Sequence, residues 1–259
     1  KNTATHTLMK TTRPALRYAA IPALALVGSL PAASSGLHAD TYTDSTSGLV
    51  LEYTVADGEA TVTGGTVPTN GKLVIPETLG GTPEVYVLNT AFRGNLEIKE
   101  LSVTSSSTVL GNYAFSDCTA LTRISLPKTA SIVIGAFLNC TSLDTVHMPV
   151  ATSIGSRVFD GCTSLTTISL PAATDIGDHA FNSCTGLTTI SLPKATSIGR
   201  EAFFDCDALT TISLPAATDI GDHAFNSCTG LTTLSLPRAT SIGNSAFRRC
   251  DALTTLSLP

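Results

Sequence analysis

The sequence predicts a repeat solenoid: an arc of stacked units with a parallel β-sheet on its concave face and short turns or 3-10/helical pieces on its convex side. Three observations predict this architecture. All the cysteines, from Cys118 to Cys250, recur at a step of 22 residues. A leucine column from Leu121 to Leu253 and a proline column from Pro127 to Pro259 keep the same step. Self-similarity at a period of about 20 to 50 residues is typical of stacked supersecondary units.

The repeating unit reads C-x-x-L-x-x-I-x-L-P-x-x-x-x-I-G-x-x-A-F-x-x, and each part has a physical interpretation. Ile168-Ser169-Leu170 alternates apolar and polar side chains, as a short half-buried strand does, and Pro171 ends the strand because proline cannot donate to a ladder. Gly177 is expected to supply a backbone turn that a residue with a Cβ would resist. The residues after it are expected to form a brief helical turn that points Phe181 inward.

A single unit is too small to be stable, so its stability must come from its neighbours in the stack. We call each turn of the coil a rung. Stacking in register places strand beside strand at about 4.8 Å, so nine rungs make a body roughly 40 Å long. The turns on the opposite side are wider than a strand spacing, which predicts a shallow arc with the sheet on its inside.

The cysteine column could be oxidised or reduced. Cysteines on neighbouring rungs, about 5 Å apart, fall within the Cα distance range for a disulfide, although parallel side chains that point the same way seldom meet. The odd count of seven and the apolar positions favour a buried, reduced ladder over disulfides. No C-x-x-C pair indicates a zinc site.

The stretch from Leu187 to Cys206 contains the L-x-x-L-x-L strand pattern, followed by P…I-G-x-x-A-F-x-x-C. In these residues, and from about residue 72 to the last one, the chain resembles the BspA-like (Treponema pallidum-type) leucine-rich repeat family. The resemblance implies a leucine-rich repeat arc with no enzymatic activity, and a role in adhesion to host extracellular proteins and in bacterial co-aggregation. Three early positions depart from the pattern: Asn95 for cysteine, Thr104 for proline and Val133 for glycine.

Residues 1–39 read as a secretory signal peptide region. Lys10, Arg13 and Arg17 precede an apolar run, Ala19 to Leu30, and small residues follow. The run is shorter than the roughly 20 residues of a membrane helix, which leaves an uncleaved anchor as the alternative. We expect translation to start at Met9, and the mature chain to be exported to the cell surface, the medium or the periplasm without a membrane span.

Residues 40–71 lack the repeat and are expected to form an N-terminal β-hairpin cap. Two alternating segments, Leu49–Val55 and Ala60–Thr63, flank Asp57-Gly58, which is a hairpin turn signal. Residues 72–259 are then the solenoid of 22–23-residue units. At its far end Leu256-Ser257-Leu258-Pro259 follows a strand with no polar cap. Either the gene is truncated there, or we expect this edge to be covered by another chain, with a homo-oligomer as one form.

Composition and motifs exclude several function classes. The net charge of −5 argues against a nucleic-acid binder. The chain has no G-x-S-x-G or G-x-x-x-x-G-K-[ST] motif, and its carboxylates are scattered. His179 and His223 lie two rungs apart, about 10 Å, which is too far to share one ion. We therefore expect a solvated surface around both histidines, and a protein with no catalytic residues, no metal and no cofactor.

The outward side of the strands carries two columns of hydroxyls with a few charges. Threonine suits strands and stabilises neighbouring strands, so a purely structural role is the main alternative. The functional hypothesis is that this preformed surface binds a macromolecule or glycan, foremost a host extracellular matrix or bacterial surface protein. The candidate binding residues are Arg123, Thr167, Ser169, Thr189, Ser191, Lys194, Thr211, Ser213, Thr233 and Ser235.

Two other functions stay open. One is a periplasmic or envelope structural protein that self-associates through its uncapped C-terminal end. The other is a carrier of a small apolar ligand, held in a groove between the N-terminal cap and the first units near Tyr53, Tyr86 and Tyr113.

Overall fold

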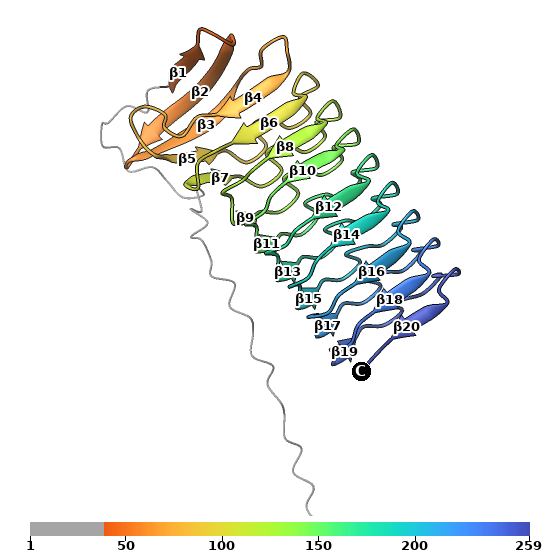
Figure 1. The fold of residues 1–259 in the computed structure, drawn as a ribbon. Helices are drawn as coiled ribbons and strands as arrows, with labels where there is room; N and C mark the ends of the chain where they lie inside the picture. Colours follow the sequence, from red (N-terminus) through yellow and green to blue (C-terminus); the bar gives the residue numbers. More distant parts are fainter. Residues whose placement is uncertain (1–38) are drawn as a thin grey trace, which may run out of the picture. The chain divides into compact units, whose positions relative to one another are not determined.

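The computed structural model describes residues 39–259, and this part of the chain is built from strands and turns (Figure 1). It contains twenty strands and no helix, so none of the described residues forms a membrane-spanning helix. Of the two forms expected on the convex side, short turns or 3-10/helical pieces, the described residues have hydrogen-bonded turns, and the helical form is not confirmed. The expected signal region lies, apart from residue 39, outside the described residues.

One side of the solenoid is a line of parallel strands, one from each rung, in two successive sheets of four and five strands. Four plus five gives the nine rungs predicted from the repeat. Pairing is in register at the repeat step, with Thr167 opposite Thr189 and Ser169 opposite Ser191. The strands are β4 (Lys72–Ile75), β6 (Glu100–Val103), β8 (Arg123–Ser125), β10 (Thr145–His147), β12 (Thr167–Ser169), β14 (Thr189–Ser191), β16 (Thr211–Ser213), β18 (Thr233–Ser235) and β20 (Thr255–Ser257).

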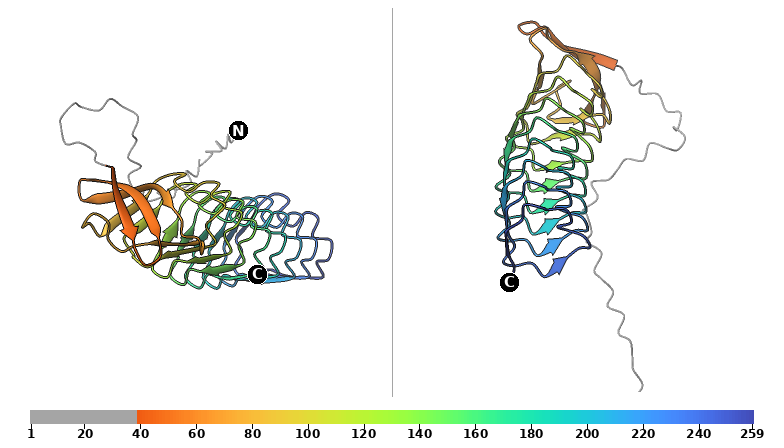
Figure 2. Two further views of the ribbon diagram at one scale, coloured as in Figure 1. Left: turned by 90° about the horizontal axis from the view of Figure 1, so that it is seen from above. Right: turned by 90° about the vertical axis from the view of Figure 1, so that its right-hand side faces the viewer.

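A second line of very short parallel strands runs along the solenoid, and the sequence analysis did not predict it (Figure 2). Each strand is a polar residue followed by isoleucine, which is buried in all but the last strand. From β11 on, the threonine just before each pair bonds to the preceding rung, as Thr174 Oγ1 does to the carbonyl of Thr152. The strands are β9 (Ser131–Ile132), β11 (Ser153–Ile154), β13 (Asp175–Ile176), β15 (Ser197–Ile198), β17 (Asp219–Ile220) and β19 (Ser241–Ile242).

The N-terminal strands form a five-stranded sheet. The predicted hairpin is present, because β2 (Leu49–Ala56) and β3 (Glu59–Thr66) pair antiparallel across the Asp57-Gly58 turn. An additional strand, β1 (Ala39–Asp44), pairs with β2. On the other side, β3 pairs parallel with β5 (Glu84–Val87), and β5 with β7 (Thr108–Leu110), so the sheet joins the hairpin to the first rungs. That these strands act as a cap stays a prediction.

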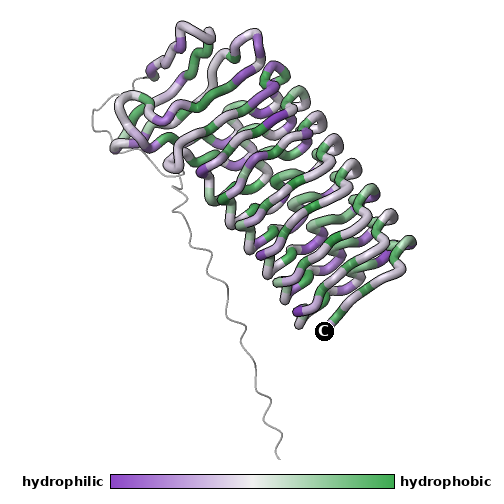
Figure 3. The backbone as a smooth tube through the Cα atoms, in the orientation of Figure 1, coloured by the Kyte–Doolittle hydropathy of each residue, from purple (hydrophilic) through white to green (hydrophobic). Residues whose placement is uncertain are grey.

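The core is a set of columns in which each side chain lies on its equivalent from the neighbouring rung. Figure 3 shows apolar and polar residues alternating along the tube of every rung. Eight phenylalanines, from Phe92 to Phe247, stack with ring centroids 5.2–6.0 Å apart and interplanar angles of 1–23°. Offset stacking at this distance adds attraction beyond the burial of area. The inward Phe181 predicted from the sequence is fully buried.

The cysteine column is buried from Cys118 to Cys228, as predicted, and Cys250 is half-buried. Every cysteine is a free thiol. Each donates to the carbonyl of a phenylalanine on the preceding rung, at Sγ···O distances of 2.9–3.3 Å. Burial raises the pKa of Cys118 to about 12 and also raises the pKa of the other thiols. The buried thiols therefore stay protonated at neutral pH, which makes them poor nucleophiles.

The repeat glycine is required for a different reason from the one predicted. Gly177 does not have a positive φ. A Cβ on it would instead lie 2.7 Å from the backbone of Gly155 on the preceding rung, and a Cβ on Gly199 would lie 2.6 Å from that of Gly177. The column is glycine because consecutive backbones touch there. The left-handed conformation falls two residues later, on His179 (φ 57°) and its equivalents, where one rung has Gly135.

Candidate functional site

The predicted hydroxyl columns lie on the outward side of the strand line. Threonine and serine from β12, β14, β16 and β18 are exposed or half-exposed, while the isoleucine or leucine between them is buried. We call this surface the hydroxyl face. It consists of Thr167, Ser169, Thr189, Ser191, Thr211, Ser213, Thr233 and Ser235, and the register of the strands aligns them in two columns.

The two predicted basic residues lie at different places. Arg123 is exposed at the start of β8, in register with Thr145 of the next strand, and so continues the threonine column. Lys194 is exposed in the turn after β14, beyond the end of the strand. The structure therefore brings Arg123 and the eight hydroxyls onto one face, and leaves Lys194 at its margin.

Other threonine columns form hydrogen bonds between successive rungs. Thr188, Thr232 and Thr254 each donate from Oγ1 to the carbonyl of the equivalent residue one rung earlier, at 3.0–3.2 Å. The column before the short strands does the same, with Thr196 Oγ1 bonding to Thr174 O at 3.2 Å. The O–H donors of these threonines are used between rungs and cannot donate to a ligand without breaking those bonds.

The hydroxyl face is different, because nearly all of its hydroxyls lack a protein partner. Within residues 39–259, only Thr189 among the eight has a hydroxyl contact, 3.3 Å to the adjacent Thr188. Free hydroxyls on a rigid sheet can donate and accept hydrogen bonds without first breaking internal ones. Sequence alone does not separate the threonine column of this face from the threonine columns that bond between rungs, because all of them are threonines repeated at the same step.

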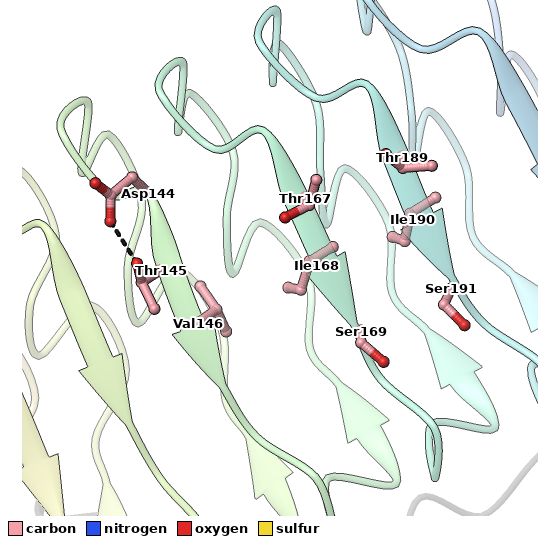
Figure 4. Close-up of a pocket in the computed structure, with 9 residues that line it drawn as sticks. All are labelled: Asp144, Thr145, Val146, Thr167, Ile168, Ser169, Thr189, Ile190 and Ser191. Atoms are coloured by element: carbon pink, nitrogen blue, oxygen red, sulfur yellow. Dashed lines mark hydrogen bonds between the residues drawn. The ribbon is translucent and has the colours of Figure 1, made fainter.

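A hollow of about 380 Å³ opens on the strand line across β10, β12 and β14 (Figure 4). Five of its nine lining residues were not predicted: Asp144, Thr145, Val146, Ile168 and Ile190. The other four, Thr167, Ser169, Thr189 and Ser191, belong to the hydroxyl face. The hydrogen-bonded ladder stops between β10 and β12, which belong to separate sheets. The signal that could have found the hollow is the β10 rung itself, which has Asp144 and Val146 where its neighbours have threonine and isoleucine.

Both histidines are half-buried rather than fully solvated, although Asp178 and Asp222 beside them are exposed. His179 Nδ1 lies 3.3 Å from Glu201 Oε2, and His223 Nδ1 lies 2.9 Å from Asn226 Nδ2. The neighbouring Asp178 accepts a hydrogen bond from the backbone N–H of Arg200 on the next rung, at 2.8 Å. No group of three or more potential metal ligands occurs within the described range. Asp178 and His179 therefore contact the next rung, whereas the contact of His223 lies within its own rung.

The proposed groove for an apolar carrier finds no support in the hollows. A second hollow, of about 320 Å³, lies in the N-terminal sheet and is lined by Glu59, Glu84, Val85, Ser107 and Val109. Neither hollow includes Tyr53, Tyr86 or Tyr113. Tyr53 is buried in the core, and the hydroxyl of Tyr86 bonds to Asn89 at 2.9 Å.

Comparison with known proteins identifies the family to which the repeat belongs. The family model described as BspA type leucine rich repeat region, in six copies, matches residues 85–203 and 152–259. A leucine rich repeat protein of Treponema pallidum is 28% identical, with a TM-score of 0.59 over 82% of this chain and 90% of that chain. A leucine-rich repeat protein of Bacteroides ovatus is 22% identical, with a TM-score of 0.56 over 82% of this chain and 75% of that chain. A search of the curated proteins found no match.

Proposed function

Because this chain belongs to the BspA-type leucine-rich repeat family, we propose that it is a non-enzymatic, exported binding protein that attaches to a protein ligand through its hydroxyl face. The ligand is a host or matrix protein, or a protein of a bacterial surface. The observation that carries the proposal is that seven of the eight hydroxyls of this face have no partner within the described residues, whereas Thr188, Thr232 and Thr254 beside it bond from rung to rung. The face is the concave side of the arc, and the chain acts at the cell surface, in the medium or in the periplasm.

The physical basis is a large surface that does not need to be ordered on binding. Every rung is tied to its neighbours through backbone ladders, threonine bonds and stacked rings. A rigid, preformed surface avoids much of the conformational entropy that a flexible one loses on association. Repeat proteins provide extended surfaces of this kind.

The test is a screen against immobilised extracellular-matrix proteins with a four-residue variant of the face. We expect saturable binding by the parent chain and at least about a tenfold loss when Thr189, Ser191, Thr211 and Ser213 are changed to lysine. The matched control carries Thr163→Lys, Ser164→Lys, Thr185→Lys and Thr229→Lys, which add the same four charges in exposed turns between the strands. Equal binding by parent and face variant would reject the hydroxyl face as the binding site.

A second candidate is self-association through the last rung. Ile242, Leu256 and Leu258 at this end are 41–46% exposed, whereas their equivalents one repeat earlier, Ile220, Leu234 and Leu236, are buried. Another copy of the chain, or further residues of a longer chain, would cover them. Light scattering of the protein tests self-association. A mass that stays monomeric at every concentration refutes it.

A further inference from the structure

The hollow across β10, β12 and β14 combines an apolar floor, a hydroxyl rim and one carboxylate. We propose that it receives a lysine or arginine side chain of a protein partner, with the alkyl stem on the floor and the cationic head beside Asp144. This inference rests on the proposed function and specifies the chemistry of the partner.

The floor is made by side chains that are more exposed than their equivalents on the other inner rungs. Val146 is only partly buried, and Ile168 and Ile190 are 5% and 6% exposed. The equivalent residues away from the hollow, Ile124 and Ile212, are 0% and 1% exposed. An apolar stem laid across these side chains would remove both surfaces from water, which stabilises the contact.

Asp144 supplies an unneutralised charge at the rim. It is exposed, and its hydrogen bond is with the hydroxyl of Thr145, which donates to Oδ1 at 2.7 Å (Figure 4). No ion pair involves Asp144 within residues 39–259, although Arg123 is on the neighbouring strand. Oδ2 is therefore free to accept from a cationic group.

Lysine and arginine match this combination because their side chains are apolar along the stem and charged at the tip. Such side chains bury the methylene groups along apolar surface and keep the head in a polar environment. The free hydroxyl of Thr167, on the rim at the Asp144 end of the hollow, can accept from a remaining N–H donor of the head. The net charge of −5 also attracts a cationic partner over long range.

The test uses two small probes that share a stem length and differ in charge. Nα-acetyl-lysine N-methylamide and Nα-acetyl-norleucine N-methylamide are titrated into the isotope-labelled chain, and backbone amide shifts are followed by NMR. We expect the lysine probe to shift signals of β10, β12 and β14, and to bind about fivefold more weakly to Asp144→Thr, the residue that neighbouring rungs have. Binding should also weaken as salt is added.

The control is Asp57→Asn, which removes one carboxylate from the hairpin turn and keeps a residue type that tolerates the positive φ of 53° there. It should leave lysine binding unchanged. Equal binding of both probes would show an apolar site and overturn the cationic assignment, and so would a response unaffected by Asp144→Thr. Shifts outside β10, β12 and β14 would overturn the location. The matrix-protein screen does not depend on this titration. Failure of that screen rejects the proposed function, whereas failure of the titration rejects only the cationic side chain in the hollow.

Discussion

Replacing Phe181 by alanine is expected to lower the free energy of unfolding by about 3–5 kcal/mol, because the ring is fully buried in the middle of its column. Its centroid lies 5.4 Å from that of Phe159 and 5.3 Å from that of Phe203, so alanine leaves a cavity between two rings that the backbone ties in place. Urea unfolding followed by circular dichroism measures the change.

Phe204 provides the matched control, because it is the one phenylalanine outside the column and is only half-buried. Phe204→Ala should cost clearly less than Phe181→Ala. Similar losses for the two variants would show that the stack contributes no more than an ordinary apolar contact.

Replacing Gly199 by alanine is expected to destabilise the chain by about 1–3 kcal/mol, which is typical of overpacking. The new Cβ would lie 2.6 Å from the nitrogen of Asp178 and from the carbonyl carbon of Gly177. Both are backbone atoms held by the short parallel strands, so neither can move aside without separating two rungs.

The control for this variant is Gly64→Ala in β3, where the nearest heavy atom would be 3.9 Å away and φ is not positive. That change should be close to neutral under the same urea titration. A neutral Gly199→Ala would contradict the close approach of consecutive backbones, and would leave the glycine column without a reason.

The columns could be predicted from the sequence because a fixed step in sequence becomes a fixed neighbour in space. Once residues 22 apart are neighbours, the stacked phenylalanines, the buried cysteines and the in-register strands all follow. The resemblance to the BspA-like family predicted the same repeat solenoid, and the family model that matches the chain confirms the family.

What could not be predicted depends on contacts between rungs rather than on the repeat. Gly177 was expected in a special backbone conformation, but its need for a small side chain comes from the preceding rung, which no local pattern reveals. The short strands such as β13 have two residues, too few for an alternating pattern to show. His179 was expected in solvent, and its contact with Glu201 depends on a residue of the next rung.

The candidate site was predicted only in part, for a related reason. The hydroxyl columns repeat, so their common face followed from the strand period. The hollow instead arises where one rung departs from the repeat. The consensus sequence of the repeat does not include Asp144 and Val146, so the consensus does not predict the hollow. In a repeat protein, the departures are therefore the positions to inspect for specificity.

The most direct test of the account is a series of distances between spin labels along one serine column of the strand line. Ser169→Cys is paired with a cysteine at Ser213, Ser235 or Ser257, with Cys250→Ser removing the half-buried thiol and the buried thiols remaining protonated. Stacked rungs predict label separations near 10, 14 and 19 Å, a constant step of about 4.8 Å per rung. Separations that do not grow evenly with the number of rungs would contradict the stacking of residues 22 apart, and with it the hydroxyl face.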